Sequence, residues 1–156
     1  IIEISNKYKI KVFHQSSEKN LKILKFFYDS NNVDSELFNF KENIFNYINE
    51  ANLAVTRSGA LTLSELVFLR VPFIAVPYKF ATDNHQLKNA LYYKNKDCCW
   101  IIEEKEFNNN KLTALLLKII EDKYDYSTKK NNIQKFYYQN TWNNINQKIV
   151  RSINEN

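Results

Sequence analysis

The sequence contains few of the residues that interrupt regular structure. Its 156 residues include one glycine, two prolines and no methionine. A single glycine excludes collagen-like repeats, Gly-rich linkers and the intact Gly-rich phosphate loops of the P-loop and GxGxxG types. Because the chain begins with Ile1 and has no methionine at all, we expect it to be a fragment of a longer protein.

Cysteine is also scarce, and the two cysteines, Cys98 and Cys99, are adjacent. Neighbouring residues of a strand point to opposite faces, so we expect no disulfide between them. The Cys/His spacing of a zinc site is absent, and no metal is predicted. We expect at least one cysteine to be buried in an apolar strand, and free thiols fit a reducing compartment. No apolar run is as long as the roughly 18 residues of a membrane-spanning helix.

The net charge is weakly informative about partners. Lysine and arginine number 22 against 17 acidic residues, which gives a formal charge of +5. A basic domain can bind nucleic acid or an anionic membrane. However, only three residues are arginine, the lysines are spread along the chain, and 23 asparagines indicate an AT-rich coding sequence. We therefore predict no nucleic-acid partner, and the 44% hydrophobic content indicates a folded domain.

Short apolar runs alternate with segments of helical period along the chain. Strands are predicted for residues 9–15, 35–40, 53–56, 73–76 and 98–102. Helices are predicted for residues 17–29, 43–50, 61–69, 84–96 and 107–122, and from 129 to the end. Such alternation predicts an α/β fold, a Rossmann-like three-layer sandwich with a parallel sheet. We expect one domain over 1–156, with an α/β core over 1–125 and C-terminal helices over 126–156.

The first candidate site follows the third predicted strand, because ligands of parallel α/β sheets bind at the carboxyl ends of strands. There Gly59 lets backbone approach a ligand closely, and the helix that follows presents free N–H groups and a positive dipole end. This combination suits an anion such as a diphosphate. Thr62 adds a hydroxyl, and Glu65 on the same face can accept hydrogen bonds from ribose hydroxyls. The alternative is an ordinary helix start with Ser58 as N-cap and Glu65 solvated.

The second candidate site follows the fourth predicted strand. Asp83 is expected to cap the next helix, whose first turn contains Asn84, His85 and Gln86, all able to bond sugar hydroxyls. The alternative is a capped helix with polar residues in its first turn. His14 ends the first predicted strand, and we assign no catalytic residue in this chain.

Two stretches together carry a family resemblance: RSGALTLSEL at 57–66 and VPFIAVPYKFATDNHQLKNA at 71–90. With VFHQSS at 12–17 and CCWIIEE at 98–104, they resemble the carboxyl-terminal domain of the MurG family over residues 9–120. Members of this family are bacterial glycosyltransferases that add N-acetylglucosamine to lipid I in peptidoglycan synthesis. The resemblance implies the C-terminal half of a GT-B glycosyltransferase, lacking its first strand and Gly-rich loop. The N-terminal acceptor domain is expected to be absent.

The resemblance also implies roles for particular residues. Backbone N–H groups at the start of the helix would face the sugar and diphosphate of UDP-N-acetylglucosamine, Glu65 would bind the ribose, and Gln86 the N-acetylglucosamine. Lys41 lies where the family recognises uracil through backbone groups. The expected donor-binding residues are Lys41, Gly59, Ala60, Leu61, Thr62, Leu63, Ser64, Glu65 and Gln86, flanked by Arg57, Ser58, Asn84 and His85.

The implied reaction is inverting transfer from UDP-N-acetylglucosamine to lipid I, which forms lipid II. It would take place in the cytoplasm at the inner face of the bacterial plasma membrane, with membrane contact only indirect and no cofactor. Because the acceptor site and the general base would lie in the absent domain, we expect this chain alone to bind donor weakly without turnover. Two alternatives remain: a donor-binding subunit of a two-part N-acetylglucosamine transferase, or a non-catalytic nucleotide-sugar binding module.

Overall fold

The computed structural model describes residues 1–139 of the chain. The strands are β1 (Lys11–Gln15), β2 (Asp34–Phe38), β3 (Ala54–Thr56), β4 (Phe73–Ala75) and β5 (Cys99–Ile101). The helices are α1 (Ile2–Lys7), α2 (Glu18–Ser30), α3 (Ile44–Glu50), α4 (Ala60–Phe68), α5 (His85–Lys94), α6 (Asn109–Glu121) and α7 (Lys123–Gln139). Two short 3₁₀ turns are η1 (Thr82–Asn84) and η2 (Glu104–Glu106). The helical prediction for residues 140–156 lies outside the described residues.

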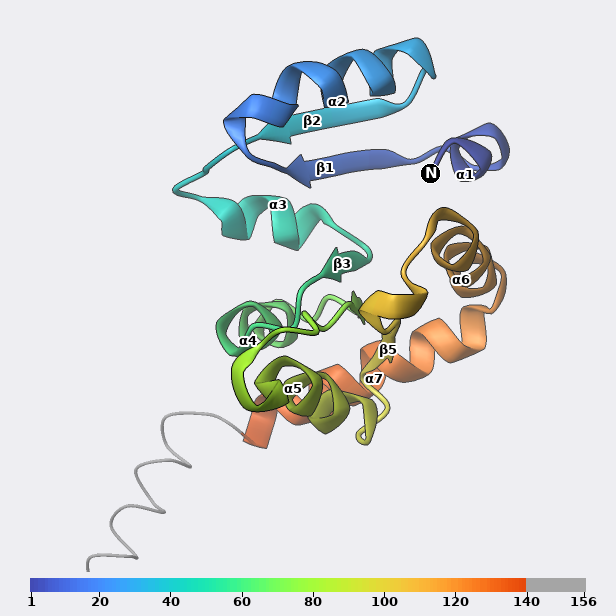
Figure 1. Cartoon of the computed structure of the whole chain (residues 1–156). Helices are drawn as coiled ribbons and strands as arrows, with labels where there is room; N and C mark the ends of the chain where they lie inside the picture. Colours follow the sequence, from blue (N-terminus) through green and yellow to red (C-terminus); the bar gives the residue numbers. More distant parts are fainter. Residues whose placement is uncertain (140–156) are drawn as a thin grey trace, which may run out of the picture.

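The five strands are all parallel to their neighbours, which confirms the predicted α/β class. They form two sheets, one with the order β1-β2 and one with the order β3-β4-β5. In the larger sheet Val55 pairs with Ile74, and Ile74 pairs with Trp100. Among the described residues β1 and β3 each have a single pairing partner, so each ends its sheet (Figure 1).

The three-stranded sheet forms the middle of the core. All three residues of its central strand β4 are fully buried, as expected for a parallel strand covered on both faces. Phe73 and Ala75 belong to a cluster with residues of α4, α5 and α7, whereas Ile74 belongs to a cluster with residues of α1 and α6. Helices therefore cover both faces of this sheet, which gives the predicted three layers.

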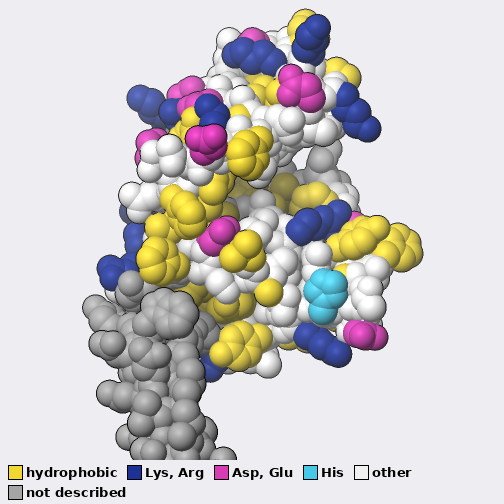
Figure 2. Space-filling model, turned by 90° about the vertical axis from the view of Figure 1, so that its left-hand side faces the viewer, with side chains coloured by type: hydrophobic (Ala, Val, Ile, Leu, Met, Phe, Trp, Pro, Cys, Tyr) yellow, Lys and Arg dark blue, Asp and Glu magenta, His cyan; other side chains and the backbone are white. Residues whose placement is uncertain are grey.

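The smaller sheet is covered by α2, which packs against β2 (Figure 1). Tyr28 is the buried residue of α2, whereas Ile23 and Phe26 are exposed. Figure 2 views the molecule from the side at which β1 and β2 end. On this face, basic and acidic side chains lie interspersed among hydrophobic ones.

Helix α7 completes the core and begins earlier than the sequence indicated. Ile133 of α7 is fully buried in the cluster with α4 and α5. Lys129 is also buried, and its Nζ lies 2.7 Å from a carboxylate oxygen of both Asp97 and Asp125. The indole of Trp100 donates to the other oxygen of Asp125 at 2.8 Å. These bonds join α7 to β5 and to the loop before it.

One helix was not predicted, and two predictions concern the thiols and membrane spans. The sequence did not indicate α1, whose Ile4 packs in the cluster with α6. Cys98 and Cys99 are both free and fully buried, so the expected burial is confirmed. Among residues 1–139, no helix has the length and apolar character needed to cross a bilayer.

Candidate ligand-binding site

The first part of the site is the start of α4, directly after β3. Gly59 occupies the N-cap position with φ −62° and ψ 137°, and no side chain caps the helix. Leu63 is the first residue of α4 whose N–H is bonded, to the carbonyl of Gly59 at 3.0 Å. Within residues 1–139 the N–H groups of Ala60, Leu61 and Thr62 have no hydrogen-bond partner. Three free donors at the positive end of a helix dipole can bind an anion.

Ser58 lies one residue before the cap, and the interpretation of Ser58 as N-cap is wrong. Its side chain is fully buried, and its Oγ has no hydrogen-bond partner among the described residues. Its backbone is held on both sides, because the N–H donates to Oε1 of Gln86 at 3.2 Å and the carbonyl accepts from Nδ2 of Asn89 at 3.0 Å. A buried hydroxyl without a partner costs about 1–3 kcal/mol and calls for an explanation in function or solvation.

The backbone conformation of Gly59 does not itself require a glycine. Its φ of −62° is accessible to every residue type. A Cβ at this position would meet only Oγ1 of Thr62, at the ordinary contact distance of 3.8 Å. The protein's own packing therefore does not require a glycine here, and close approach of a ligand remains the physical reason for one.

The expected donor-binding residues in the rest of α4 differ in the hydrogen-bonding groups that remain available to a ligand. Leu63 has a fully buried side chain and a bonded N–H, so it has no free donor. The hydroxyl of Ser64 donates back to the carbonyl of Ala60 at 2.8 Å. Leu61 is 74% exposed. The half-buried carboxylate of Glu65 has no partner among the described residues, so it is available as an acceptor.

The second part of the site is Gln86, in the first turn of α5. Its Oε1 accepts from the N–H of Ser58 at 3.2 Å and from the N–H of Tyr78 at 3.0 Å. Both partners are backbone donors, so they fix which end of the amide is the oxygen. Nε2 makes no hydrogen bond within the described residues. Gln86 therefore joins the loops after β3 and β4 and keeps one donor free.

The cap of α5 differs from the sequence prediction. Asp83 does not cap α5: Asn84 is at the N-cap position, and both have positive φ, 51° and 53°. Neither supplies a side-chain cap, since no cap hydrogen bond forms. Asn84 and His85 are exposed, and Nδ1 of His85 lies 2.8 Å from the carbonyl of Thr82. His85 is therefore a surface residue involved in a local turn.

Glu104 also lies in this region, although its role was not predicted from the sequence. One carboxylate oxygen accepts from Nη2 of Arg57 at 2.6 Å, and the other accepts from the N–H of Lys79 at 2.9 Å. These hydrogen bonds, first that of Lys79 and then that of Arg57, hold the pKa of Glu104 below its usual range. Glu104 follows β5, so the rule that selected the ends of β3 and β4 would also have selected it.

Lys41 is not brought together with these residues. It follows β2, with Nζ 3.9 Å from the carboxylate of Glu36 and 5.3 Å from the ring centre of Tyr47. Among the described residues, no hydrogen bond or ion pair joins it to the loops beside α4. The structure thus gives its side chain a local role at the end of the smaller sheet.

His14 lies at the end of β1, where its Nδ1 is 2.9 Å from the hydroxyl of Tyr28. Partial burial lowers the pKa of His14 below its usual value. With Ser16 and Asn20 it lines a hollow of about 260 Å³. This hollow belongs to the smaller sheet and contains none of the expected donor-binding residues.

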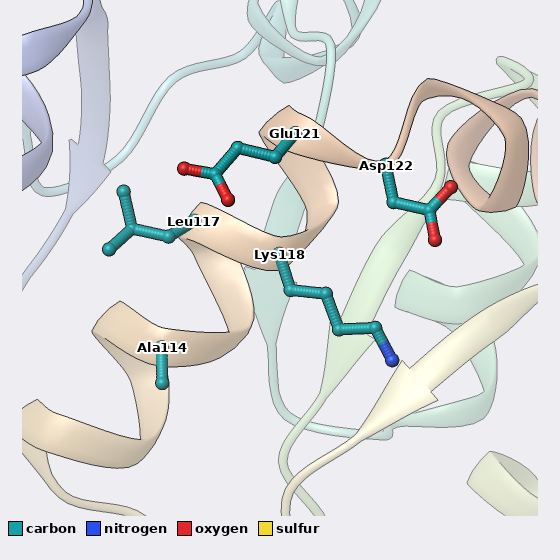
Figure 3. Close-up of a pocket in the computed structure, with 5 residues that line it drawn as sticks. All are labelled: Ala114, Leu117, Lys118, Glu121 and Asp122. Carbon is teal, nitrogen blue, oxygen red and sulfur yellow. The ribbon is translucent and has the colours of Figure 1, made fainter.

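A larger hollow, of about 550 Å³, lies on α6 and is also separate from the site (Figure 3). It is open and lined by Ala114, Leu117, Lys118, Glu121 and Asp122. Helix α6 contributes to the cluster on the opposite face of the sheet from α4 and α5. In the part of the chain that the structure describes, no group of three or more His, Cys, Asp or Glu residues could hold a metal ion.

The fold and the site define a class of protein. Parallel strands with helices on both faces, and an uncapped helix N-terminus directly after a strand, are typical of domains that bind nucleotides and other phosphate ligands. Residues 2–143 match the glycosyltransferase family 28 C-terminal domain. The chain belongs to this family.

Comparisons with individual relatives and with a solved structure support the same family. The chain is 42% identical over its whole length to the UDP-N-acetylglucosamine–N-acetylmuramyl-(pentapeptide) pyrophosphoryl-undecaprenol N-acetylglucosamine transferase of Pelagibacter ubique, and covers 44% of that protein. To the enzyme of the same name from Sulfurovum sp. it is 37% identical over 125 residues, 78% of this chain and 37% of the relative. The crystal structure of Acinetobacter baumannii MurG matches with a TM-score of 0.74 and 21% identity, over 85% of this chain and 39% of that one. The chain thus spans less than half the length of these relatives.

Proposed function

We propose that this chain supplies the donor-binding domain of a UDP-N-acetylglucosamine-dependent transferase that converts lipid I to lipid II in peptidoglycan synthesis. The observation that carries the proposal is the uncapped start of α4, with three free N–H groups directly after Ser58 and Gly59. The relative from Pelagibacter ubique, 42% identical over the whole chain, is named for transfer of N-acetylglucosamine. The lipid-linked acceptor would place the reaction at the inner face of the plasma membrane.

The diphosphate of the donor would lie against the start of α4. During transfer, negative charge grows on the departing UDP, and fixed N–H dipoles stabilise that charge without having to reorganise. The N–H groups of Ala60, Leu61 and Thr62 would supply this stabilisation. The guanidinium of Arg57, three residues before α4, lies at the same end of the sheet and is paired with the carboxylate of Glu104.

Two further side-chain groups of the site, which have no partner among the described residues, suit the rest of the donor. The carboxylate of Glu65 can accept hydrogen bonds from both vicinal hydroxyls of a ribose. The free Nε2 of Gln86 can donate to a sugar oxygen, while its Oε1 stays bonded to Ser58 and Tyr78. A nucleotide sugar therefore has a complementary group in the chain for each of its polar parts except the base, for which Lys41 and its neighbours after β2 are the candidates.

The general base and the acceptor site would lie in a region that corresponds to the part of the relatives outside the match with this chain. We therefore expect the chain to bind donor and not to turn over. The assay is transfer of labelled N-acetylglucosamine from UDP-N-acetylglucosamine to lipid I. Steady turnover by the purified chain would overturn this expectation.

Calorimetry with UDP-N-acetylglucosamine tests the donor site itself. Removing the charged acceptor with Glu65→Gln is expected to weaken binding about 10- to 100-fold, since a hydrogen bond to a charged group contributes about 1.5–3 kcal/mol. Glu18→Gln is the matched control, because Glu18 is an exposed carboxylate in the first turn of α2. Equal affinity of the Glu65→Gln variant and wild type, or no binding by wild type, would contradict the proposal.

A further inference from the structure

Glu104 joins three loops that follow three neighbouring strands. It is the first residue of η2, after β5, and its side chain is 21% exposed. One oxygen of its carboxylate holds Arg57, after β3, and the other holds the backbone N–H of Lys79, after β4. Both oxygens of one carboxylate are thus used at the edge of the sheet where α4 begins.

Gln86 also joins the loops after β3 and β4, through residues adjacent to those that Glu104 bonds. It bonds Ser58 and Tyr78, while Glu104 bonds Arg57 and Lys79. The loops after β3 and β4 are therefore tied together twice, by one side chain from α5 and one from η2. The direction of the free N–H groups of α4 depends on the loop that precedes them, so these two ties control how α4 meets a ligand.

The guanidinium of Arg57 has few other interactions to hold it. It lies 5.5 Å from the ring centre of Tyr78, and Nη1 is at 3.4 Å from the carbonyl of Val76, which is a weak hydrogen bond. Its side chain is 51% exposed, so without Glu104 it would sample several rotamers. The 2.6 Å contact with Glu104 is the short, charge-assisted bond of this group.

We propose that Glu104 is a positioning residue of the donor site, whose carboxylate fixes Arg57 and the loop after β4 beside the start of α4. This inference rests on the proposed function. Because the Arg57 side of this ion pair is half exposed to solvent, the pair contributes little to the free energy of unfolding. The role of Glu104 is therefore expected in local order and ligand affinity, with the melting temperature nearly unchanged.

The test compares Glu104→Gln and Glu104→Ala with the control Glu103→Gln. Glu103 is the exposed neighbour whose carboxylate pairs with Lys105 at 2.9 Å. In ligand-free protein, residue-resolved amide exchange of Lys79 should become at least about tenfold faster in Glu104→Ala and change little in Glu104→Gln, which keeps an acceptor oxygen. The control should leave this amide unchanged. Unchanged exchange in Glu104→Ala would overturn the inference without any ligand.

Affinity for UDP-N-acetylglucosamine, measured by calorimetry, is the second readout. Both Glu104 variants should bind about 3- to 10-fold more weakly, because each releases Arg57. In a double-mutant cycle, Arg57→Gln should cost little further affinity once Glu104 is replaced. Additive losses, or wild-type affinity in both Glu104 variants, would overturn the inference. If wild type itself does not bind, the donor proposal fails, while the exchange of Lys79 still decides whether Glu104 orders these loops.

Discussion

Replacing Ser58 by alanine should stabilise the free domain. The Oγ of Ser58 is fully buried with no partner among the described residues, whereas its N–H and carbonyl are both bonded. Alanine removes only the hydroxyl and keeps both backbone bonds. A buried unpaired hydroxyl costs about 1–3 kcal/mol, so the free energy of unfolding should rise by about that amount. In a domain of this size, about 1 kcal/mol corresponds to about 2–4 °C, which predicts a rise in Tm of about 2–12 °C.

Ser35 provides the matched control. It lies in β2, away from α4, and its Oγ is also buried without a partner in the described part of the chain. Ser35→Ala should therefore raise Tm as well. The two variants should differ in affinity for UDP-N-acetylglucosamine, with Ser58→Ala about tenfold weaker and Ser35→Ala unchanged. The difference follows if a small movement of the loop lets the hydroxyl of Ser58 donate to the diphosphate.

Thermal unfolding followed by circular dichroism, with calorimetry of donor binding, measures both effects. A Tm of Ser58→Ala equal to or below that of wild type would refute the reasoning, since it would show that the hydroxyl has a partner in the free domain. A higher Tm with unchanged affinity would show that Ser58 is not part of the donor site. Residues that lower stability but support ligand binding are common at functional sites.

Further predictions concern the site, the core and the thiols. Gln86→Glu keeps the oxygen that accepts from both backbone N–H groups but removes the free N–H of Nε2. The affinity for UDP-N-acetylglucosamine should therefore fall about tenfold in calorimetry, with Tm nearly unchanged. Lys129→Met leaves the carboxylate of Asp125 without its charged partner. The free energy of unfolding, measured in urea, should fall by about 1–3 kcal/mol. This loss is smaller than that for a fully buried ion pair, because Asp125 is partly exposed. Burial alone would raise the pKa of Asp125, but the hydrogen bonds it accepts lower it. Its contribution is therefore complete above the unfolded value of about 3.9 and is lost as pH falls through the folded pKa, so acid should weaken wild type more than Lys129→Met. Burial raises the pKa of Cys98 to about 11 and that of Cys99 to about 12, so neither should react with iodoacetamide at pH 8 until urea unfolds the chain; rapid labelling of the native protein would contradict their burial.

Segments with strong local signals were predictable from the sequence, as β4 and α6 show. The run 73–76 lies between two prolines and is continuously apolar, which is the pattern of a buried parallel strand. Residues 107–122 have a long amphipathic period, and α6 forms within them. Helix α1 has only six residues, too few for a period to stand out from chance. The start of α5 was misplaced because Asp83 and Asn84 take up left-handed backbone conformations, which a capping rule does not anticipate.

The links between segments were not predictable, because no local pattern records them. Glu104 and Arg57 are 47 positions apart, and the sequence around neither residue indicates that the two form a pair. The division of the strands into two sheets depends on which strands lie side by side, a property that alternation of strands and helices does not determine. The rule that ligands bind at the carboxyl ends of strands located the edge of the sheet, and the structure supplied the side chains that meet there.

Gln86 shows how the structure restricts a role that the sequence left open. From the sequence, its amide could donate to or accept from a sugar hydroxyl. In the structure the amide oxygen already accepts from the backbone N–H groups of Ser58 and Tyr78, so its remaining hydrogen-bonding capacity lies mainly in the donor Nε2. The same two bonds connect the loop before α4 to the loop after β4. A ligand oxygen that binds Nε2 would therefore be held by a group whose orientation is set by the loops beside the start of α4. In the proposed function, this arrangement couples recognition of the sugar to the geometry of the diphosphate site.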